Sequence, residues 1–258
     1  MSTVVPILAA AWPELAGTRI EPVTKGMSGA LVFRSGRTGY PDHYLKIAEP
    51  DAAAALQREI ECTRWLGAQG LRVPTILRVE TVEERLALLT QAVPGTAAAE
   101  SELPPDSLAE VLARGMAALH RMPGACPFDE SVAVRLARAA RDVAFGSIDP
   151  AHFEPRNSDV APETLLARLQ LDPPVEDTVV VHGDATLTNL IIDADGSLGF
   201  VDCGHSGRGD RYLDLAVLAA EIEEYYSRET ATRFIRAYGL DRWDAAKAWY
   251  FSDLYELF

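Results

Sequence analysis

Three polar side chains stand at fixed spacing among apolar runs in the middle of the chain. Asp184 follows the strand-like segment Val179 to Val181, Asn189 lies five residues on, and Asp202 ends the apolar segment Leu198 to Val201. A carboxylate at a strand end can act as general base towards a hydroxyl. An amide oxygen and a second carboxylate are ligands that Mg²⁺ accepts. Each residue alone is explained as a turn residue, but together, in this order and spacing, they indicate phosphoryl transfer.

Lys46 is the next residue that could take part in such chemistry. The chain has three lysines against 21 arginines, and this one lies between Leu45 and Ile47 in an apolar, strand-like run. A strand lysine that contacts the ATP phosphates and pairs with a helix glutamate is a part of kinase sites. Glu59, on the following helix, is the expected partner and Glu61 is the alternative. A solvent-facing strand lysine remains the other interpretation of Lys46.

A turn of small residues, Gly26 to Ala30, precedes this strand. Its backbone N–H groups and the Ser28 hydroxyl could bind phosphate. It lacks the Gly-Lys-Ser or Gly-Lys-Thr of a Walker A loop and is not a full GxGxxG motif. Taken by itself, the turn predicts only a hairpin.

The N-terminal part that carries these residues is predicted to be rich in β-strands. Leu31 to Phe33 and His43 to Ile47 are apolar runs joined by a turn, which predicts a hairpin. Asp51 is the expected N-cap of a helix that runs to about Leu66. Arg85 to Ala92 predicts a further strand.

The chain changes character after residue 92. Val93-Pro94-Gly95 breaks the last strand, and a segment rich in alanine and proline follows to Pro105. Apolar residues at helical spacing then predict helices near residues 106–119, 131–145, 162–171, 213–226, 229–238 and 241–258. We therefore predict an α+β protein with a β-rich N-terminal lobe (1–92), a hinge (93–105) and a mainly helical C-terminal lobe (106–258) carrying a small β insertion.

The charge of the chain is unevenly divided. The net charge is −14 over 258 residues, and residues 101–258 hold 27 acids and 14 bases against 11 and 10 in residues 1–100. This excess repels polyanions, so nucleic acid is not an expected partner. A polycationic small molecule is a plausible partner, although a generic acidic surface explains the same charge.

The remaining composition is that of an ordinary globular protein without a membrane partner. The three cysteines, an odd number without a CxxC pair, are expected to be reduced thiols. No segment approaches the roughly 20 apolar residues of a membrane span, and the N-terminal apolar run has no preceding positive charge. We expect a cytoplasmic protein that is a monomer or a weak dimer.

Several motifs in this order resemble the aminoglycoside phosphotransferases, most closely the 3′-phosphotransferases. The matching stretches are GMSGALVFR (26–34), YLKIA (44–48), LTQAVPG (89–95), VVVHGDATLTNLIID (179–193), VDCGHSGRGDRYLDLA (201–216) and YELF (255–258). The resemblance implies a protein-kinase-like bilobal fold that binds ATP and Mg²⁺ and phosphorylates the 3′-hydroxyl of a cationic aminoglycoside. A kinase of another small alcohol or amino sugar, or a silent nucleotide-binding regulator, is the alternative.

The resemblance also implies roles for particular residues. Asp184 would be the catalytic base and contact the substrate, Asn189 and Asp202 would bind Mg²⁺, and Lys46 with Glu59 would position the phosphates. The nucleotide would further meet Ser28, Tyr44, Gln91, Ala92 and Val93. The antibiotic would meet Glu154, Asp159, Glu221, Glu256 and the terminal carboxylate of Phe258.

Three positions depart from the family pattern. His205 stands where an arginine usually follows the Asp-Cys-Gly turn, Tyr255 replaces an aspartate before Glu256, and Ala220 replaces an arginine before Glu221. These departures lie in or near the predicted antibiotic site. They leave the reaction unchanged and the substrate range open.

Overall fold

The computed structural model describes residues 4–23, 29–122 and 125–258. The chain forms two compact units: the first holds Met1–Gly95 with Gly199–Gly204, and the second holds Thr96–Leu198 with His205–Phe258. A five-stranded sheet in the first unit and mainly helices in the second confirm the α+β class. No helix within the described ranges is long and apolar enough to cross a membrane.

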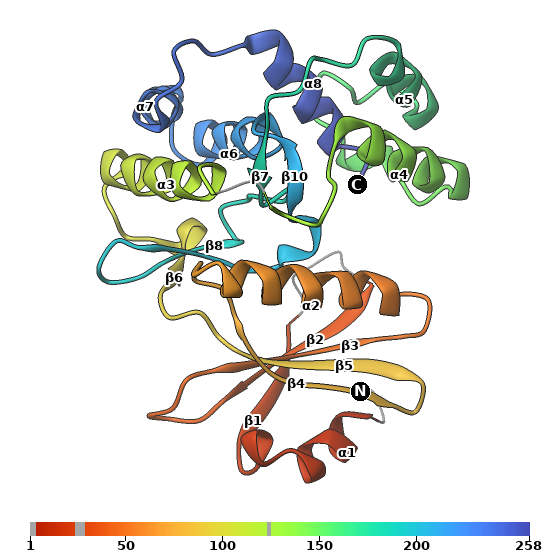
Figure 1. Cartoon of the computed structure of the whole chain (residues 1–258), viewed down its shortest axis with the longest axis vertical. Helices are drawn as coiled ribbons and strands as arrows, with labels where there is room; N and C mark the ends of the chain where they lie inside the picture. The colour runs from red at the N-terminus through yellow and green to blue at the C-terminus, as the bar shows by residue number, and fades with distance from the viewer. Residues whose placement is uncertain (1–3, 24–28, 123–124) are drawn as a thin grey trace. The chain divides into compact units, whose positions relative to one another are not determined.

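The first unit is built on one antiparallel sheet (Figure 1). Its strands are β1 (Arg19–Pro22), β2 (Ala30–Gly36), β3 (His43–Ala48), β4 (Thr75–Val82) and β5 (Arg85–Gln91), in the order β1-β2-β3-β5-β4. The predicted hairpin is confirmed as β2 and β3, in which Leu31 pairs with Ile47. Strand β3 is therefore central, with β2 on one side and β5 on the other.

The two faces of this sheet bury different side chains because neighbours along a strand point to opposite faces. Leu45 and Ile47 of β3 pack with α1 (Val4–Ala11) and the 3₁₀ turn Pro13–Leu15. Ala48 packs with Leu56 and Ile60 of α2 (Ala53–Ala68). By this alternation Lys46 shares the α2 face with Ala48.

The start of α2 corrects one prediction. Asp51 was expected to be its N-cap, but the N-cap residue is Ala52 and it makes no side-chain capping bond. Asp51 Oδ1 accepts instead from the backbone N of Ala52 at 3.0 Å. The carboxylate thus closes a local turn just before the helix rather than bonding to the second or third helical N–H.

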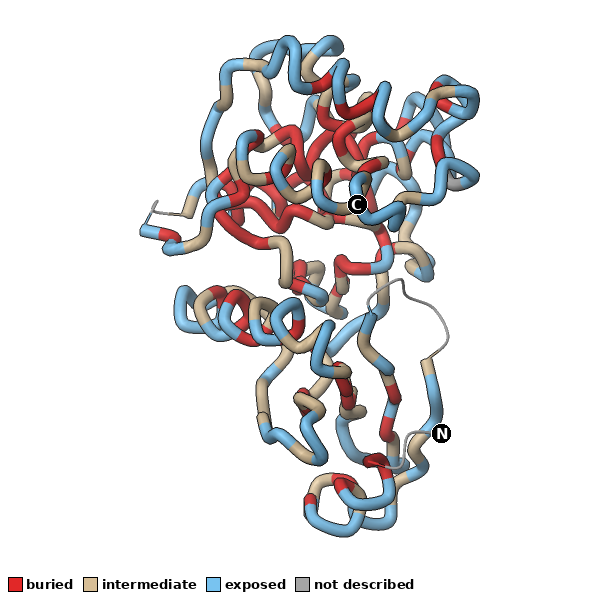
Figure 2. Tube along the Cα trace, turned by 90° about the vertical axis from the view of Figure 1, so that its right-hand side faces the viewer, coloured by how far each residue is buried: buried red, intermediate tan, exposed pale blue. Residues whose placement is uncertain are grey.

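The second unit is a helical assembly. Its helices are α3 (Pro105–His120), α4 (Val132–Phe145), α5 (Pro162–Leu171), α6 (Tyr212–Tyr225), α7 (Arg228–Tyr238) and α8 (Ala245–Tyr255). Helix α7 packs against α3 and α6, and α8 packs against α6 and α5. Buried apolar side chains of α4, α5, α6 and α8 form a shared core, and Figure 2 shows the buried segments in the interior of the unit.

Short strands within this unit carry Asp184 and Asn189 of the polar motif. Strand β7 (Thr178–Val181) pairs antiparallel with β10 (Gly207–Asp210), and β8 (Leu190–Ile192) pairs with β6 (Thr96–Ala97). Asp184 therefore follows β7 and Asn189 directly precedes β8. After β9 (Leu198–Phe200) the chain enters the segment that carries Asp202.

Candidate active site

In the first unit, Lys46 lies between two carboxylates. Its Nζ is 2.7 Å from Glu59 Oε1 and also contacts Asp202 Oδ1. The Lys46 side chain is 13 % exposed. Burial would lower the pKa of Lys46, but the charges of Asp202 and Glu59 outweigh it and raise the pKa. The lysine is therefore a fixed cation.

The structure distinguishes between the two glutamates predicted as partners. Glu59 lies next to Ile60, which packs into the sheet, so its carboxylate reaches the sheet face. Glu61 is exposed and accepts from Gln57 at 2.8 Å. Of the two, Glu59 is the one that contacts Lys46.

The segment around Asp202 has an unusual backbone. Asp202 has φ +56°, in the left-handed region, which non-glycine residues enter at a cost and which is common at functional sites. The following turn is held by α2, since Arg58 Nε donates to the Gly204 carbonyl at 3.4 Å. Burial raises the pKa of the Cys203 thiol, so this cysteine stays protonated and is no nucleophile.

Residues predicted to meet the nucleotide belong to the same unit. Tyr44 lies in β3, Gln91 ends β5, and Ala92 and Val93 follow it. The backbone N–H of Ala92 donates to the Asp42 carbonyl at 2.9 Å, so that N–H is already used within the unit. Ser28 lies outside the described residues.

In the second unit, the Asp184 carboxylate is held on both oxygens. Asn189 Nδ2 donates to Oδ2 at 2.8 Å and also to the Asp184 carbonyl at 3.0 Å. The Tyr255 hydroxyl donates to Oδ1 at 2.7 Å. The loop itself is closed by the Asn189 N–H, which donates to the Thr186 carbonyl at 3.0 Å. This arrangement fixes the direction of the carboxylate.

The backbone before Asp184 is anchored by a buried carboxylate on α6. Asp214 accepts from the N–H groups of His182 and Gly183 at 2.8 and 2.7 Å. His120 Nε2 lies 2.9 Å from Asp214 Oδ2. Burial would raise the pKa of Asp214, but the bonds from His120 and the His182 backbone lower it overall. Asp214 therefore stays ionised and holds the strand-to-loop turn.

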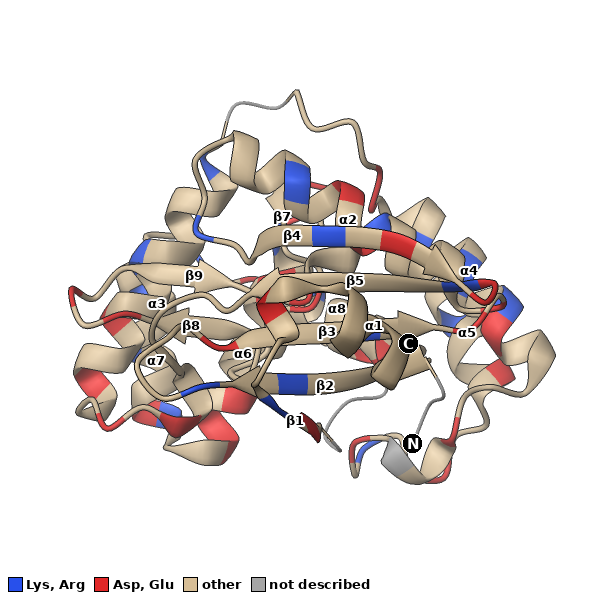
Figure 3. Cartoon of the chain, turned by 90° about the horizontal axis from the view of Figure 1, so that it is seen from below, with Lys and Arg blue, Asp and Glu red and all other residues tan. Residues whose placement is uncertain are grey.

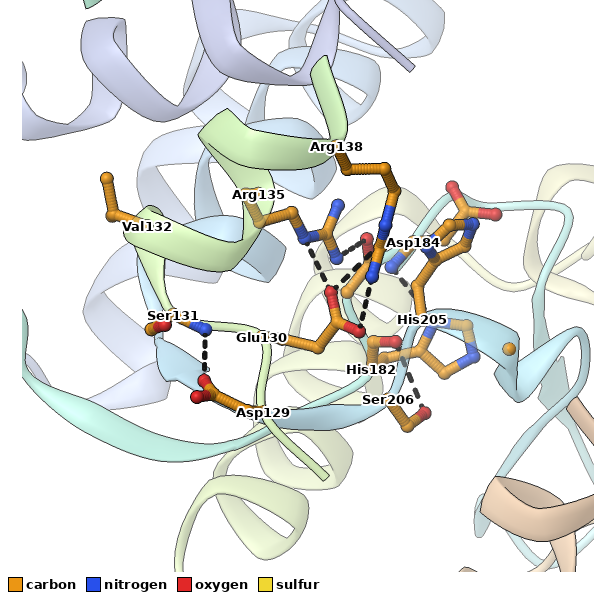
Figure 4. A network of polar contacts seen from close by, with 12 residues as sticks. Asp129, Glu130, Ser131, Val132, Arg135, Arg138, His182, Asp184, His205 and Ser206 are labelled. Carbon is orange, nitrogen blue, oxygen red and sulfur yellow. Dashed lines mark hydrogen bonds and ion pairs between the residues drawn. The ribbon is translucent and has the colours of Figure 1, made fainter. Parts of the chain in front are cut away.

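A second anchor comes from α4 (Figure 4). Arg135 Nη2 donates to the Gly183 carbonyl at 2.8 Å, and its Nε lies 2.8 Å from Glu130 Oε2. Both side chains are almost fully buried, at 1 % and 0 % exposed. Gly183 has φ +79°, and a Cβ there would lie 2.4 Å from Arg135 Nη2. Only glycine fits this contact.

The same cluster reaches the turn that follows the Asp-Cys-Gly segment. Arg138 Nη2 lies 3.1 Å from Glu130 Oε1, and its Nη1 is 3.0 Å from His205 Nδ1. The guanidinium of Arg135 stacks on the Phe258 ring at 5.0 Å from its centroid. The position of His205, noted as a departure from the family pattern, is thus supported by an arginine from α4.

The acids predicted to bind the antibiotic have separate environments. Glu221 accepts from the Leu187 N–H at 2.5 Å, and burial raises its pKa. Burial also raises the pKa of Glu256, which accepts from Asn157 Nδ2 at 2.9 Å and Arg156 Nη2 at 3.2 Å. Glu154 and Asp159 are exposed. Glu154 is joined to Glu256 through its backbone N–H, at 3.3 Å.

A cavity of about 970 Å³ lies between α6, α7, α8 and residues 153–156. Glu154, Glu223 and Glu224 line it, as does Trp249, on whose ring the Arg156 guanidinium stacks at 4.6 Å. Of the residues predicted to meet the antibiotic, Glu154 alone lines this cavity.

The site also contains residues that were not predicted from the sequence. Tyr255 and the Glu130–Arg135–Arg138 cluster were not predicted as site residues, although Tyr255 was noted as a sequence departure. Within the ranges that the structure describes, no group of three or more His, Cys, Asp or Glu side chains is arranged to hold a metal ion. The predicted magnesium ligands, the amide of Asn189 and the carboxylate of Asp202, do not form such a group, because they contain only one acidic side chain.

The proteins that this chain resembles are phosphotransferases, in agreement with the geometry of the site. Residues 19–249 match the model of the phosphotransferase enzyme family. The chain is 33 % identical over 251 residues to an aminoglycoside 3′-phosphotransferase of Streptomyces fradiae, covering 92 % of this chain and 94 % of the relative.

Two solved structures share the fold over nearly the whole chain. An aminoglycoside-3′-phosphotransferase of type VIII superposes with a TM-score of 0.87 at 33 % identity, covering 98 % of this chain and 97 % of that one. The aminoglycoside phosphotransferase APH(3″)-Id from Streptomyces rimosus, in complex with ADP and streptomycin, has a TM-score of 0.84 at 29 % identity, with coverage of 100 % and 99 %.

Proposed function

Because this chain belongs to the phosphotransferase enzyme family, we propose that it transfers the γ-phosphate of ATP to the 3′-hydroxyl of an aminoglycoside antibiotic and thereby confers resistance. The observation that carries the proposal is the Asp184 carboxylate, held on both oxygens at the end of an anchored turn. A general base must be oriented in this way to receive the proton of an attacking hydroxyl. The activities for which the relatives are named support the aminoglycoside as acceptor.

In the proposed reaction the substrate oxygen attacks the γ-phosphorus while the bond to the bridging oxygen of ADP breaks. The proton of the 3′-hydroxyl passes to Asp184. The loose transition state of phosphoryl transfer needs mainly positioning and charge stabilisation. Lys46, a fixed cation, would bind the α- and β-phosphates, with Glu59 holding it.

Mg²⁺ fits the donor set that the chain offers. Asn189 uses its amide nitrogen on Asp184, so its amide oxygen is the atom that would bind the cation. Asp202 would supply a carboxylate, and Mg²⁺ prefers such oxygen ligands. When bound, Mg²⁺ supplies positive charge to the phosphate oxygens. Asp202 also contacts Lys46, and we propose that this contact yields to the cation.

The remaining nucleotide contacts are proposed from the sequence motifs. Ser28 would meet the phosphates, Tyr44 would stack on adenine, and Gln91, Ala92 and Val93 would bond its edge. The ADP complex of a similar structure supports nucleotide binding by this fold. Since the Ala92 N–H bonds to Asp42, we expect the adenine to use another backbone group of this segment.

The antibiotic is proposed to bind through acidic groups of the helical unit. Glu154, Asp159, Glu221, Glu256 and the carboxylate of Phe258 would meet its ammonium groups. The excess of acids in residues 101–258 and the cavity lined by Glu154 support a cationic ligand. Figure 3 shows acidic residues in red and basic residues in blue along the chain. Long-range attraction to such a surface raises the rate of encounter with a polycation.

We also propose the lobe boundaries 1–92, 93–105 and 106–258, a cytoplasmic location, and a monomer or weak dimer. Neither nucleic acid nor membrane is a proposed partner. These proposals rest on the composition and break residues of the sequence.

A second candidate is phosphorylation of the 3″-hydroxyl of a streptomycin-type antibiotic. A structure named for that position, solved with streptomycin and ADP, superposes almost as well as the 3′ relative. The two candidates share the nucleotide and the base and differ only in the acceptor.

An ADP-release assay with kanamycin B, tobramycin and streptomycin tests the proposal. Kanamycin B and tobramycin differ by the 3′-hydroxyl, so the 3′ activity predicts turnover of kanamycin B and none of tobramycin. Turnover of streptomycin alone would favour the second candidate. Asp184→Ala should bind ATP and lose transfer to every acceptor, and substantial residual transfer would refute Asp184 as base.

A further inference from the structure

Tyr255 is the last residue of α8 and touches the proposed base directly. Its hydroxyl donates to Asp184 Oδ1 at 2.7 Å, while Asn189 occupies Oδ2. The ring is half-buried, and burial, with Asp184 beside it, raises the pKa of the phenol. The phenol therefore keeps its proton and acts as a donor.

The position of Tyr255 is fixed from two directions. Its neighbours Leu254 and Leu257 are fully buried. The adjoining Glu256 and Asp253 both accept from Asn157 Nδ2, at 2.9 Å each. The phenol is therefore carried on a helix end that is packed on one side and hydrogen-bonded to the segment holding Glu154.

The charges around Asp184 favour a hydrogen bond from the Tyr255 hydroxyl to its carboxylate. Burial is the largest cause of the raised pKa of the Tyr255 phenol, followed by the charge of Asp184 and then that of Glu221, while Arg135 lowers it. The pKa of Glu221 is raised mainly by burial, and the charge of Asp184 raises it further. Two carboxylates near each other repel, so the Tyr255 donor on Oδ1, together with Asn189 on Oδ2, stabilises a single orientation of the Asp184 side chain. A charge-assisted O–H···O⁻ bond is among the stronger hydrogen bonds of proteins.

We propose that Tyr255 is a positioning residue for the phosphoryl transfer, which holds Asp184 in the orientation that receives the proton of the substrate hydroxyl. This inference rests on the proposed function of Asp184 as base. The phenol itself keeps its proton through the reaction. The proton moves from the substrate oxygen to Asp184, the new P–O bond forms, and ADP leaves.

Tyr255→Phe removes only the hydroxyl, so it tests the inference directly. We expect kcat to fall roughly 10- to 100-fold, the range for losing a hydrogen bond to a charged group, with KM for ATP and antibiotic within about twofold. Tyr250→Phe is the matched control. It removes the same atom from the same helix, where the hydroxyl donates to the Leu169 carbonyl at 3.0 Å, and should leave kcat unchanged.

The Asp184→Asn variant distinguishes a positioning role of Tyr255 from a merely structural one. Because Tyr255 acts through Asp184, Tyr255→Phe should have no further effect on the residual rate of Asp184→Asn. A kcat equal to that of Tyr250→Phe, a raised kcat, or a loss confined to KM would overturn the inference. Thermal melting of both variants should match the wild type within about 2 °C.

Basal ATP hydrolysis, in which water replaces the antibiotic, tests the role of Tyr255 independently of whether the acceptor is an aminoglycoside. A wild-type protein that ignores every antibiotic refutes the acceptor. If its ATP hydrolysis still falls roughly 10-fold or more in Tyr255→Phe, the positioning role stands. If hydrolysis does not fall, the positioning role is refuted as well.

Discussion

Replacing Arg135 with methionine tests the anchor that holds the turn before Asp184. Methionine keeps much of the side-chain length but removes the guanidinium. The change takes away the bond to the Gly183 carbonyl and the ion pair with Glu130. Glu130, which is fully buried, is then left with Arg138 as its partner in that cluster.

The expected cost follows from burial. Removing one partner of a buried ion pair costs about 3–5 kcal/mol, because the other charge loses its compensation. Arg138 still faces Glu130 and the new methionine packs as an apolar group, so we expect the lower end, about 3 kcal/mol. For a chain of this size that corresponds to a fall in Tm of roughly 6–12 °C.

Arg141 on the same helix is exposed and gives the matched control. Arg141→Met should change stability by no more than about 0.5 kcal/mol. Differential scanning calorimetry of both variants at equal concentration makes the comparison. If Arg135→Met melts within about 1 °C of Arg141→Met, the anchor contributes nothing and this reasoning is refuted.

Two further predictions concern charged groups of the site. Lys46→Met should lower kcat/KM for ATP by roughly 100-fold or more, because it removes a positive charge directed at the phosphates. The control Glu61→Gln changes an exposed residue of the same helix as Glu59 and should leave steady-state kinetics within about twofold of the wild type. Equal kinetics in both variants would contradict the role of Lys46. The pKa of Asp214 is lower in the folded state than its unfolded value, near 3.8, so the ionised carboxylate stabilises the fold. This stabilisation is fully present at a pH above 3.8 and is lost as the pH falls through the lower pKa of the folded state. Urea unfolding below pH 4 should therefore show a shallower loss of stability in Asp214→Asn than in the wild type, and identical slopes would refute the assignment.

The parts of the site that are local in sequence were predictable. Asp184 and Asn189 lie within one loop, so their meeting followed from the spacing. Lys46 and Glu59 met because the alternation of a strand and the period of the next helix direct both side chains to one face. The hairpin of β2 and β3 followed from its apolar runs.

Other features depend on tertiary approach and left little trace in the sequence. Tyr255 reaches Asp184 across 71 residues, and Arg135 reaches Gly183 from another helix. Strand β10, Gly207–Asp210, has no β-branched or aromatic residue and was not predicted. Its pairing with β7 and its close approach to Glu130, which leaves no room for a Cβ at Gly207, determine its conformation.

The position of the transferred phosphate shows whether the protein is a 3′-phosphotransferase. The wild-type protein is incubated with ATP, Mg²⁺ and kanamycin B, and the product is analysed by ³¹P and ¹H NMR, with tobramycin as the acceptor that lacks the hydroxyl. We predict a single phosphate ester on the 3′-oxygen of kanamycin B and no ester on tobramycin. An ester at another position, or equal phosphorylation of both antibiotics, would contradict the proposed activity.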